Sequence, residues 1–219
     1  MIIAKNIHKS FENNHILKGI DLNVDKGEII SLVGASGAGK TTLLQILGTI
    51  DYYDKKVNTK LLINNYDLSS MSHTQLAKFR NQEIGFIFQF HQLLPEFTAI
   101  ENVCIPSYIC NTPKKIAESR AKELMEYLGI NDKINKKPSE LSGGEKQRVA
   151  VARSLINKPS IILADEPSGN LDTKSSIKLH DLFMNLRKDF NFTFLIATHD
   201  ISLAKKSDRI LEIIDGKIK

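Results

Sequence analysis

The chain has 219 residues, of which 42% are hydrophobic and 25% charged, and its formal net charge is +5. This length suits one domain, or one domain with a subdomain, and it is sufficient for a full hydrophobic core. No apolar run approaches the roughly 20 residues that span a bilayer, so we expect no membrane-spanning helix.

The N-terminus lacks the layout of a secretory signal, in which charged residues precede an apolar run. The two cysteines, Cys104 and Cys110, match no metal spacing and imply no disulfide framework, so a reducing cytosol fits. The lysines occur as scattered pairs such as Lys114-Lys115 rather than in one stripe. We therefore expect a solvated surface and no nucleic acid partner.

The first thirty residues alternate between apolar and polar positions, as strands with one buried face do, and turn signals lie at Asn13-Asn14 and Lys26-Gly27. Phe11 lies in this segment, and its local sequence favours a core aromatic.

A glycine-rich loop at 34–42 follows the apolar run 29–33 and leads into helical spacing at 43–47. It carries the full G-x-x-x-x-G-K-[ST] pattern. Glycines leave backbone N–H groups open to a triphosphate, and a helix N-terminus adds partial positive charge. We expect Lys40 at the β- and γ-phosphates and the Thr41 hydroxyl on Mg²⁺. The pattern predicts nucleotide binding by Gly34, Ala35, Ser36, Gly37, Ala38, Gly39, Lys40, Thr41 and Thr42.

The next segment, 51–65, is polar and irregular except for a short predicted strand at 61–63, and Asn64-Asn65 makes a plausible tight turn. Residues 84–88 are typical of a buried strand, which ends on Gln89.

Helical patterns replace strand patterns from 91 to 158. We expect Thr112 to cap a helix whose first residue is Pro113 and which Gly129 ends. The apolar face of this helix is predicted to consist of Ala117, Ala121, Leu124, Met125 and Leu128.

The run 141–148 reads L-S-G-G-E-K-Q-R and precedes a helix expected at 147–155. Two interpretations are about equally good on local physics. The serine and glycines could expose N–H groups to an anion, or Ser142 could be an ordinary N-cap with Glu145 as its capping-box partner.

A buried strand is predicted at 161–164 and delivers Asp165 and Glu166 to its carboxyl end, where ligands of open α/β sheets bind. Asp165 would hold Mg²⁺ and Glu166 would act as general base. A helix with Leu179, Leu182, Phe183 and Leu186 on one face and a strand at 192–197 follow. This alternation predicts an α/β fold with a parallel sheet.

Taken in order, the loop 34–42, Gln89, the run 141–148, Asp165-Glu166, the segment 170–172 and His199 resemble the motif set of ABC transporter ATPase domains. The resemblance implies a phosphate-loop NTPase core with an N-terminal antiparallel β-subdomain and an inserted α-helical subdomain. It implies a single domain over 1–219, with the core at 1–90 and 159–219 and the helical subdomain at 91–158.

The same resemblance implies a head-to-tail homodimer that holds ATP and Mg²⁺ between two copies. Each ATP would lie between the phosphate loop of one copy and the 142–145 segment of the other. The implied roles are adenine stacking by Phe11, Mg²⁺ sensing by Gln89, catalysis by Glu166, His199 and Lys40, a dimer-interface position for Asp172, and contact with ATP by Ser142, Gly143, Gly144 and Glu145.

A narrower resemblance, carried by 88–103 and 166–172, is to the LolD group of lipoprotein-releasing ATPases. It implies an ATPase on the cytoplasmic face of a bacterial inner membrane, membrane subunits of the LolC/LolE type, and only indirect contact with lipoprotein. Alternatives are MacB-type efflux, FtsE-type cell division and, less favoured, a soluble ABC protein acting on nucleic acid or the ribosome. Segment 90–103 is expected to contact a membrane subunit through Leu93, Leu94 and Phe97, unless these residues fill the core.

Overall fold

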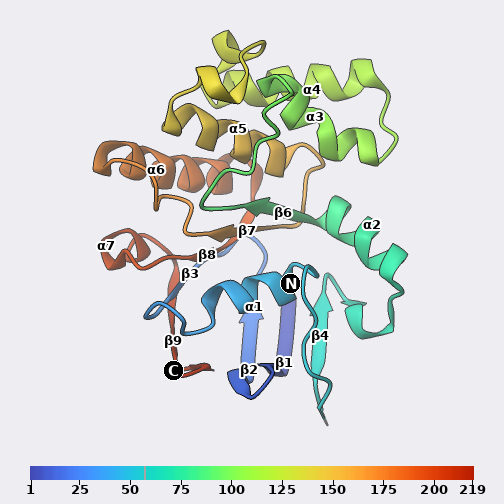
Figure 1. Ribbon diagram of the computed structural model, residues 1–219, viewed down its shortest axis with the longest axis vertical. Helices are drawn as coiled ribbons and strands as arrows, with labels where there is room; N and C mark the ends of the chain where they lie inside the picture. Colours follow the sequence, from blue (N-terminus) through green and yellow to red (C-terminus); the bar gives the residue numbers. More distant parts are fainter. Residues whose placement is uncertain (57) are drawn as a thin grey trace.

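The computed structural model describes residues 1–56 and 58–219, and two β-sheets organise them (Figure 1). An antiparallel sheet lies at the bottom of the view, a mainly parallel sheet crosses the middle, and helices α3, α4 and α5 lie at the top. Val57, in the segment predicted to be irregular, lies outside the described residues. In the described part of the chain no helix is both long and apolar enough to cross a membrane.

The antiparallel sheet is built from the N-terminal segment, where Ile2, Ala4 and Ile7 are buried and the intervening positions are mostly more exposed. Its order is β2-β1-β4-β5. The predicted turn at Asn64-Asn65 is confirmed, since both residues have positive φ, 50° and 66°. The strands are β1 (Ile2–Phe11), β2 (Asn14–Val24), β4 (Lys60–Ile63) and β5 (Tyr66–Asp67).

The second sheet has the order β10-β9-β3-β8-β7-β6, and every pairing except β10 with β9 is parallel. Helices cover both faces, which explains the continuous apolar runs of its central strands. On β7, Ile161 and Leu163 join the core cluster between the two sheets, whereas Ile162 and Ala164 join the cluster under the helices. The strands are β3 (Ile29–Val33), β6 (Ile84–Ile87), β7 (Ile161–Asp165), β8 (Thr193–Ala197), β9 (Arg209–Ile214) and β10 (Lys217–Ile218).

Helix α1 packs between the two sheets, while α3, α4, α5 and α6 contribute to the other core cluster. The predicted apolar face of α4 is confirmed, because Ala117, Ala121, Met125 and Leu128 are buried and Leu124, partly buried, packs against the same core. The predicted α/β fold class is thereby confirmed. The helices are α1 (Lys40–Leu47), α2 (His73–Glu83), α3 (Ala99–Ile109), α4 (Lys114–Tyr127), α5 (Gly143–Leu155), α6 (Thr173–Phe190) and α7 (Ile201–Ala204), with 3-10 turns at Leu68–Ser70, Asn131–Lys133 and Pro138–Glu140.

Two predicted helix starts are wrong. Helix α4 begins at Lys114, because Pro113 has an extended ψ of 137° and is itself the N-cap, so Thr112 lies outside. Helix α5 begins at Gly143 rather than at residue 147. Its two glycines are poor helix formers, but the capping box of Ser142 with Glu145 outweighs that preference.

Candidate active site

A hollow at one edge of the parallel sheet collects most of the predicted site residues. Strands β3, β8, β7 and β6 are neighbours and point the same way, so the loops after their carboxyl ends meet. The hollow has a volume of about 490 Å³ and is lined by Phe11, Ile16, Ser36, Gly37, Gly39, Lys40, Thr41, Thr42, Gln89, Glu166 and His199.

The phosphate loop, residues 34–42, needs glycine at specific positions. Gly37 and Gly39 have φ of 79° and 107°, a left-handed conformation that other residues adopt with strain. A Cβ on Gly39 would also approach the Leu17 side chain to 2.7 Å. Around Gly37 there is open space, so there the backbone conformation alone favours glycine.

Lys40 lies under this loop with only 8% of its surface exposed. Its ammonium donates to the carbonyls of Gly34, at 2.8 Å, and Ala35, at 3.1 Å. The loop therefore holds a cation at the start of α1, where the helix N-terminus adds further positive potential. An anion entering the hollow meets both.

Thr41 and Asp165 bring two oxygen ligands together from different elements. The Thr41 hydroxyl donates to Oδ1 of Asp165 at 3.0 Å. Burial, and to a lesser degree the charge of Glu166, raises the pKa of the Asp165 carboxyl, while Thr41 and Lys40 oppose that rise. Hydroxyl and carboxylate oxygens suit Mg²⁺, which usually takes one or two protein carboxylates and completes its shell with water and substrate phosphates. Accordingly, the described residues contain no cluster of three or more His, Cys, Asp or Glu side chains that could hold a metal alone.

Glu166 and His199 form a pair at the rim of the hollow. Oε2 of Glu166 lies 2.9 Å from Nδ1 of His199 and accepts the His199 backbone N–H at 3.3 Å. The backbone of Glu166 has φ of 45°, a strained conformation for glutamate, and its N–H donates to the Ala197 carbonyl at 2.9 Å. This turn directs a carboxylate, 16% exposed, toward an imidazole that is 71% exposed.

Gln89 is tied to the loop that follows Glu166. The Asn170 side chain donates to the Gln89 carbonyl at 2.9 Å. Further along the same loop, Asp172 caps α6 by accepting the backbone N–H of Ser175 at 3.0 Å and its hydroxyl at 2.6 Å. Asp172 is exposed and is not a lining residue of the hollow.

The 142–145 turn (Ser142, Gly143, Gly144 and Glu145) is likewise outside this hollow. Ser142 Oγ accepts the Glu145 N–H at 3.3 Å, and Glu145 Oε2 accepts the Ser142 N–H at 2.8 Å. Hydrogen bonds from Ser142, and secondarily Lys133, lower the pKa of Glu145. The capping-box interpretation is thus fulfilled within one chain. Ser142 and Gly143 nevertheless remain exposed.

Phe11 is not a core residue. Its side chain is 48% exposed and lines the hollow beside Ile16. The Lys9 ammonium lies 4.7 Å from the centroid of its ring. We did not predict Lys9 near this site from the sequence. Lys9 and Phe11 are two residues apart on a strand, however, and that spacing places both side chains on the same face of the sheet.

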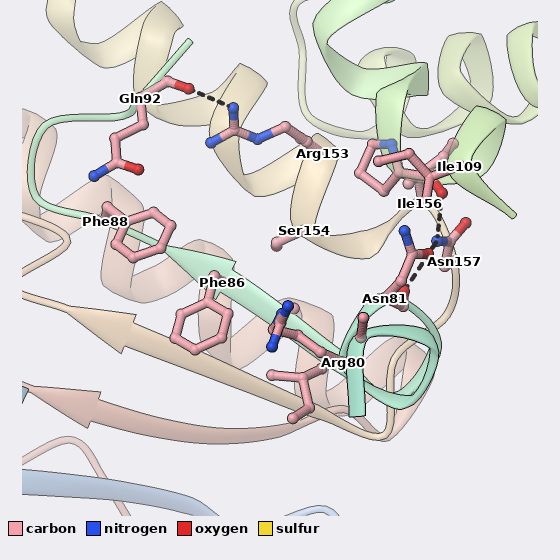
Figure 2. Close-up of a pocket in the computed structure, with 14 residues that line it drawn as sticks. Arg80, Asn81, Phe86, Phe88, Gln92, Ile109, Arg153, Ser154, Ile156 and Asn157 are labelled. Atoms are coloured by element: carbon pink, nitrogen blue, oxygen red, sulfur yellow. Dashed lines mark hydrogen bonds between the residues drawn. The ribbon is translucent and has the colours of Figure 1, made fainter. Parts of the chain in front are cut away.

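A second hollow, of about 420 Å³, lies between α2 and β6 on one side and α3 and α5 on the other (Figure 2). Phe86 and Phe88 stack in its wall with centroids 5.2 Å apart. The Arg153 guanidinium donates to the carbonyls of Gln92, at 2.6 Å, and His91, at 2.7 Å. Both of those residues have positive φ, 41° for His91 and 48° for Gln92. Arg153 therefore joins α5 to the strained segment that follows Gln89.

Comparison with known proteins gives this geometry its context. A family profile described as ABC transporter matches residues 17–169. Two proteins named lipoprotein-releasing system ATP-binding protein LolD align along nearly their full lengths. The one from Bacteroides fragilis is 54% identical and covers 100% of both chains, and the one from Bacteroides thetaiotaomicron is 55% identical and covers 100% of this chain and 99% of its own.

The chain belongs to the ABC transporter family, in the LolD group. It is an ATPase that binds ATP and hydrolyses it. Among solved structures, the bacterial ABC transporter cassette MJ0796 as a dimer superposes with a TM-score of 0.89 at 36% identity, covering 100% of this chain and 97% of that one. A post-hydrolysis dimer of the same cassette with ADP and Pi gives a TM-score of 0.88 at 35% identity, with the same coverage. The expected ATPase fold and activity are therefore confirmed.

Proposed function

We propose that this chain is the ATP-hydrolysing subunit of a complex that releases lipoproteins from the inner membrane of a bacterium. The observation that carries the proposal is full-length similarity to proteins named as the ATP-binding part of a lipoprotein-releasing system. The chain itself would act from the cytoplasmic face, with membrane subunits of the LolC/LolE type as partners. Lipoprotein would contact those partners rather than this chain.

Within one chain, we assign the chemistry to the residues around the first hollow. Lys40 and the loop amides bind the triphosphate, and Glu166 takes a proton from the attacking water as general base. His199, paired with Glu166 at 2.9 Å, orients that water and contacts the γ-phosphate. Thr41, Asp165 and Gln89 would hold Mg²⁺, which when bound neutralises charge on the transferred phosphoryl group.

The 142–145 turn would serve a second copy of the chain. Its Ser142 and Gly143 are exposed, it lies outside the hollow, and it has glycine N–H groups at the start of α5, a helix of 13 residues. The related cassette was solved as a dimer. We propose a homodimer in which each turn closes on ATP held by the other copy, with Asp172 at the interface. We propose residues 91–158 as the helical subdomain that carries the turn.

The membrane subunit would dock at the second hollow and on the exposed apolar side chains of the segment 90–97, of which Gln92 lines that hollow. Phe90, Leu94 and Phe97 are 71%, 44% and 41% exposed, whereas Leu93 packs against the core. An apolar helix or loop of the partner would fit this surface if it also carried hydrogen-bond acceptors for Arg80 and Arg153, which line the hollow. Because Arg153 lines the hollow and holds the His91 and Gln92 carbonyls, docking would act on the segment next to Gln89.

A double variant, Leu94→Glu with Phe97→Glu, tests the docking surface. The double variant should lose co-purification with the membrane subunits while its Tm stays within a few degrees of the parent. Ile177→Glu is the matched control, because Ile177 on α6 is exposed to the same 44%. If the double variant unfolds instead, these side chains belong to the core and the surface is wrongly assigned.

Reconstitution tests the function itself. The complex is purified from native membranes and placed in vesicles that contain a fluorescently labelled lipoprotein. We expect ATP to release the lipoprotein, and the Glu166→Gln complex to leave it in place. A complex that hydrolyses ATP and retains its membrane subunits but never releases lipoprotein would contradict the transport proposal and leave the ATPase intact.

A further inference from the structure

Lys9 is a charged residue that the antiparallel sheet holds in one position. Only 9% of it is exposed. Its ammonium donates to Oδ1 of Asp51 and to the carbonyl of Tyr52, each at 2.7 Å. Asp51 and Tyr52 follow α1, the helix that begins at the phosphate loop. Lys9 therefore connects β1 to the far end of that helix.

The same ammonium lies against the ring of Phe11. It is 4.7 Å from the ring centroid, within the range of a cation–π contact. Phe11 and Ile16 line the hollow beside the phosphate loop, whereas Lys9 is not among its lining residues and is held by Asp51 and Tyr52. The Phe11 ring thus has a cation fixed against it, while 48% of the residue remains exposed.

We propose that Lys9 is a positioning residue for the base of the bound nucleotide. Phenylalanine has no hydroxyl through which a hydrogen bond could orient it, so its ring depends on neighbours for its angle. Lys9 supplies that orientation and draws π-electron density toward its own face, which favours stacking of an electron-rich purine on the open face. The inference rests on the proposed ATP site and on the adenine-stacking role that the family resemblance implies for Phe11.

The proposal separates the base from the phosphates. Lys40 would bind the triphosphate, and it is held by the Gly34 and Ala35 carbonyls, at 2.8 and 3.1 Å, rather than by Lys9 or Phe11. Loss of the Lys9 side chain should therefore weaken the binding of nucleotides and leave the binding of a ligand without a base unchanged. A purely structural role in holding the segment after α1 would weaken both.

Isothermal titration calorimetry of ATP and of inorganic tripolyphosphate, both with Mg²⁺, tests this prediction. We expect Lys9→Met to weaken ATP binding about 3- to 30-fold, the range of a cation–π contact between an exposed and a desolvated site. Tripolyphosphate affinity should not change, and Lys9→Arg should restore most of the ATP affinity. Lys5→Met is the matched control, since Lys5 is an exposed lysine on the same strand.

Equal weakening of ATP and tripolyphosphate by Lys9→Met would overturn the proposal, and so would unchanged ATP affinity. Phe11→Ala distinguishes the two levels of the argument. Stacking is worth about 1–3 kcal/mol per base. This variant should therefore weaken ATP binding about 5- to 150-fold and leave the affinity for tripolyphosphate unchanged. If Phe11→Ala does not selectively weaken ATP binding, the assignment of the base site to Phe11 is wrong. If Phe11→Ala does so and Lys9→Met does not, only the assignment of Lys9 is wrong.

Discussion

The phosphate loop and the 142–145 turn are both glycine-containing segments at the start of a helix, yet they differ in what surrounds them. Around the phosphate loop, Lys40 and Thr41 at the start of α1 and Glu166 after β7 approach one hollow. In the 142–145 turn, Ser142 and Glu145 accept each other's backbone N–H groups, and Ser142 and Gly143 are exposed. A helix N-terminus alone is therefore not a site. The phosphate loop has its counterparts within the chain, whereas the turn would need them from another copy.

Of the substitutions in the two regions, removal of the general base should have the largest effect on the rate of ATP hydrolysis. Glu166→Gln keeps the size and hydrogen-bonding capacity of the side chain but cannot accept a proton. Turnover should fall about 10²- to 10⁴-fold, with ATP affinity near that of the parent. Steady-state phosphate release and nucleotide titration measure the two quantities. A variant that turns over at more than half the parent rate would exclude Glu166 as the base, and His199 would become the first candidate.

A negative charge at the turn gives the next largest effect. Aspartate is as good an N-cap as serine, so Ser142→Asp should preserve α5 and the Tm while repelling a triphosphate. A hydrogen bond to a charged group is worth about 1.5–3 kcal/mol, so ATP hydrolysis should fall about 10- to 150-fold.

The matched control is Ser72→Asp, because Ser72 caps α2 in the same kind of capping box, with Gln75. Its hydrolysis rate should equal that of the parent. Full activity in the Ser142→Asp protein would mean that the turn is only a helix cap.

The smallest effect concerns folding and involves neither region. His180 on α6 is 2% exposed, and burial, helped by Lys206, lowers its pKa from 6.5 to about 4, against the opposing charges of Asp200 and Asp181. Below pH 6.5 the unfolded chain binds the proton more readily, so stability is lost as pH falls toward 4. The expected loss is about 2 kcal/mol at about pH 5 relative to neutral pH.

Urea unfolding of the parent and of His180→Leu across this pH range measures that contribution. The variant should lack this part of the pH dependence. An unchanged slope in His180→Leu would assign the acid sensitivity to other groups.

The sequence was most informative where the chain alternates strand, loop and helix. The apolar run before the phosphate loop and the run before Asp165 are β3 and β7, and their parallel pairing to β8 brings both loops to one edge. Helix α2 was missed, because Phe79 is its only buried residue and leaves almost no apolar periodicity. Its capping box, Ser72 with Gln75, was the readable signal.

Contacts between distant segments could not be read from local pattern. The bonds from Arg153 to the carbonyls of His91 and Gln92, 62 and 61 residues away in the chain, depend on how α5 packs against β6. The contact of Lys9 with Asp51 depends likewise on the placement of the segment after α1. Local pattern likewise left a helix cap and an anion site equally good for the 142–145 turn, and only the order of the motifs along the chain favoured contact with ATP.

Complementation between two inactive chains tests most directly the claim that the active site is completed by a second copy. Lys40→Ala removes the cation of the phosphate loop and Ser142→Asp blocks the turn, so each protein alone should keep at most about a tenth of the parent activity. In an equal mixture, each mixed dimer contains one composite site with an intact Lys40 and an intact Ser142. We expect ATP hydrolysis to rise well above the sum of the separate activities, up to about a quarter of the parent rate, because about half of randomly paired dimers hold one intact site of two. A mixture that shows only the sum would contradict the shared site.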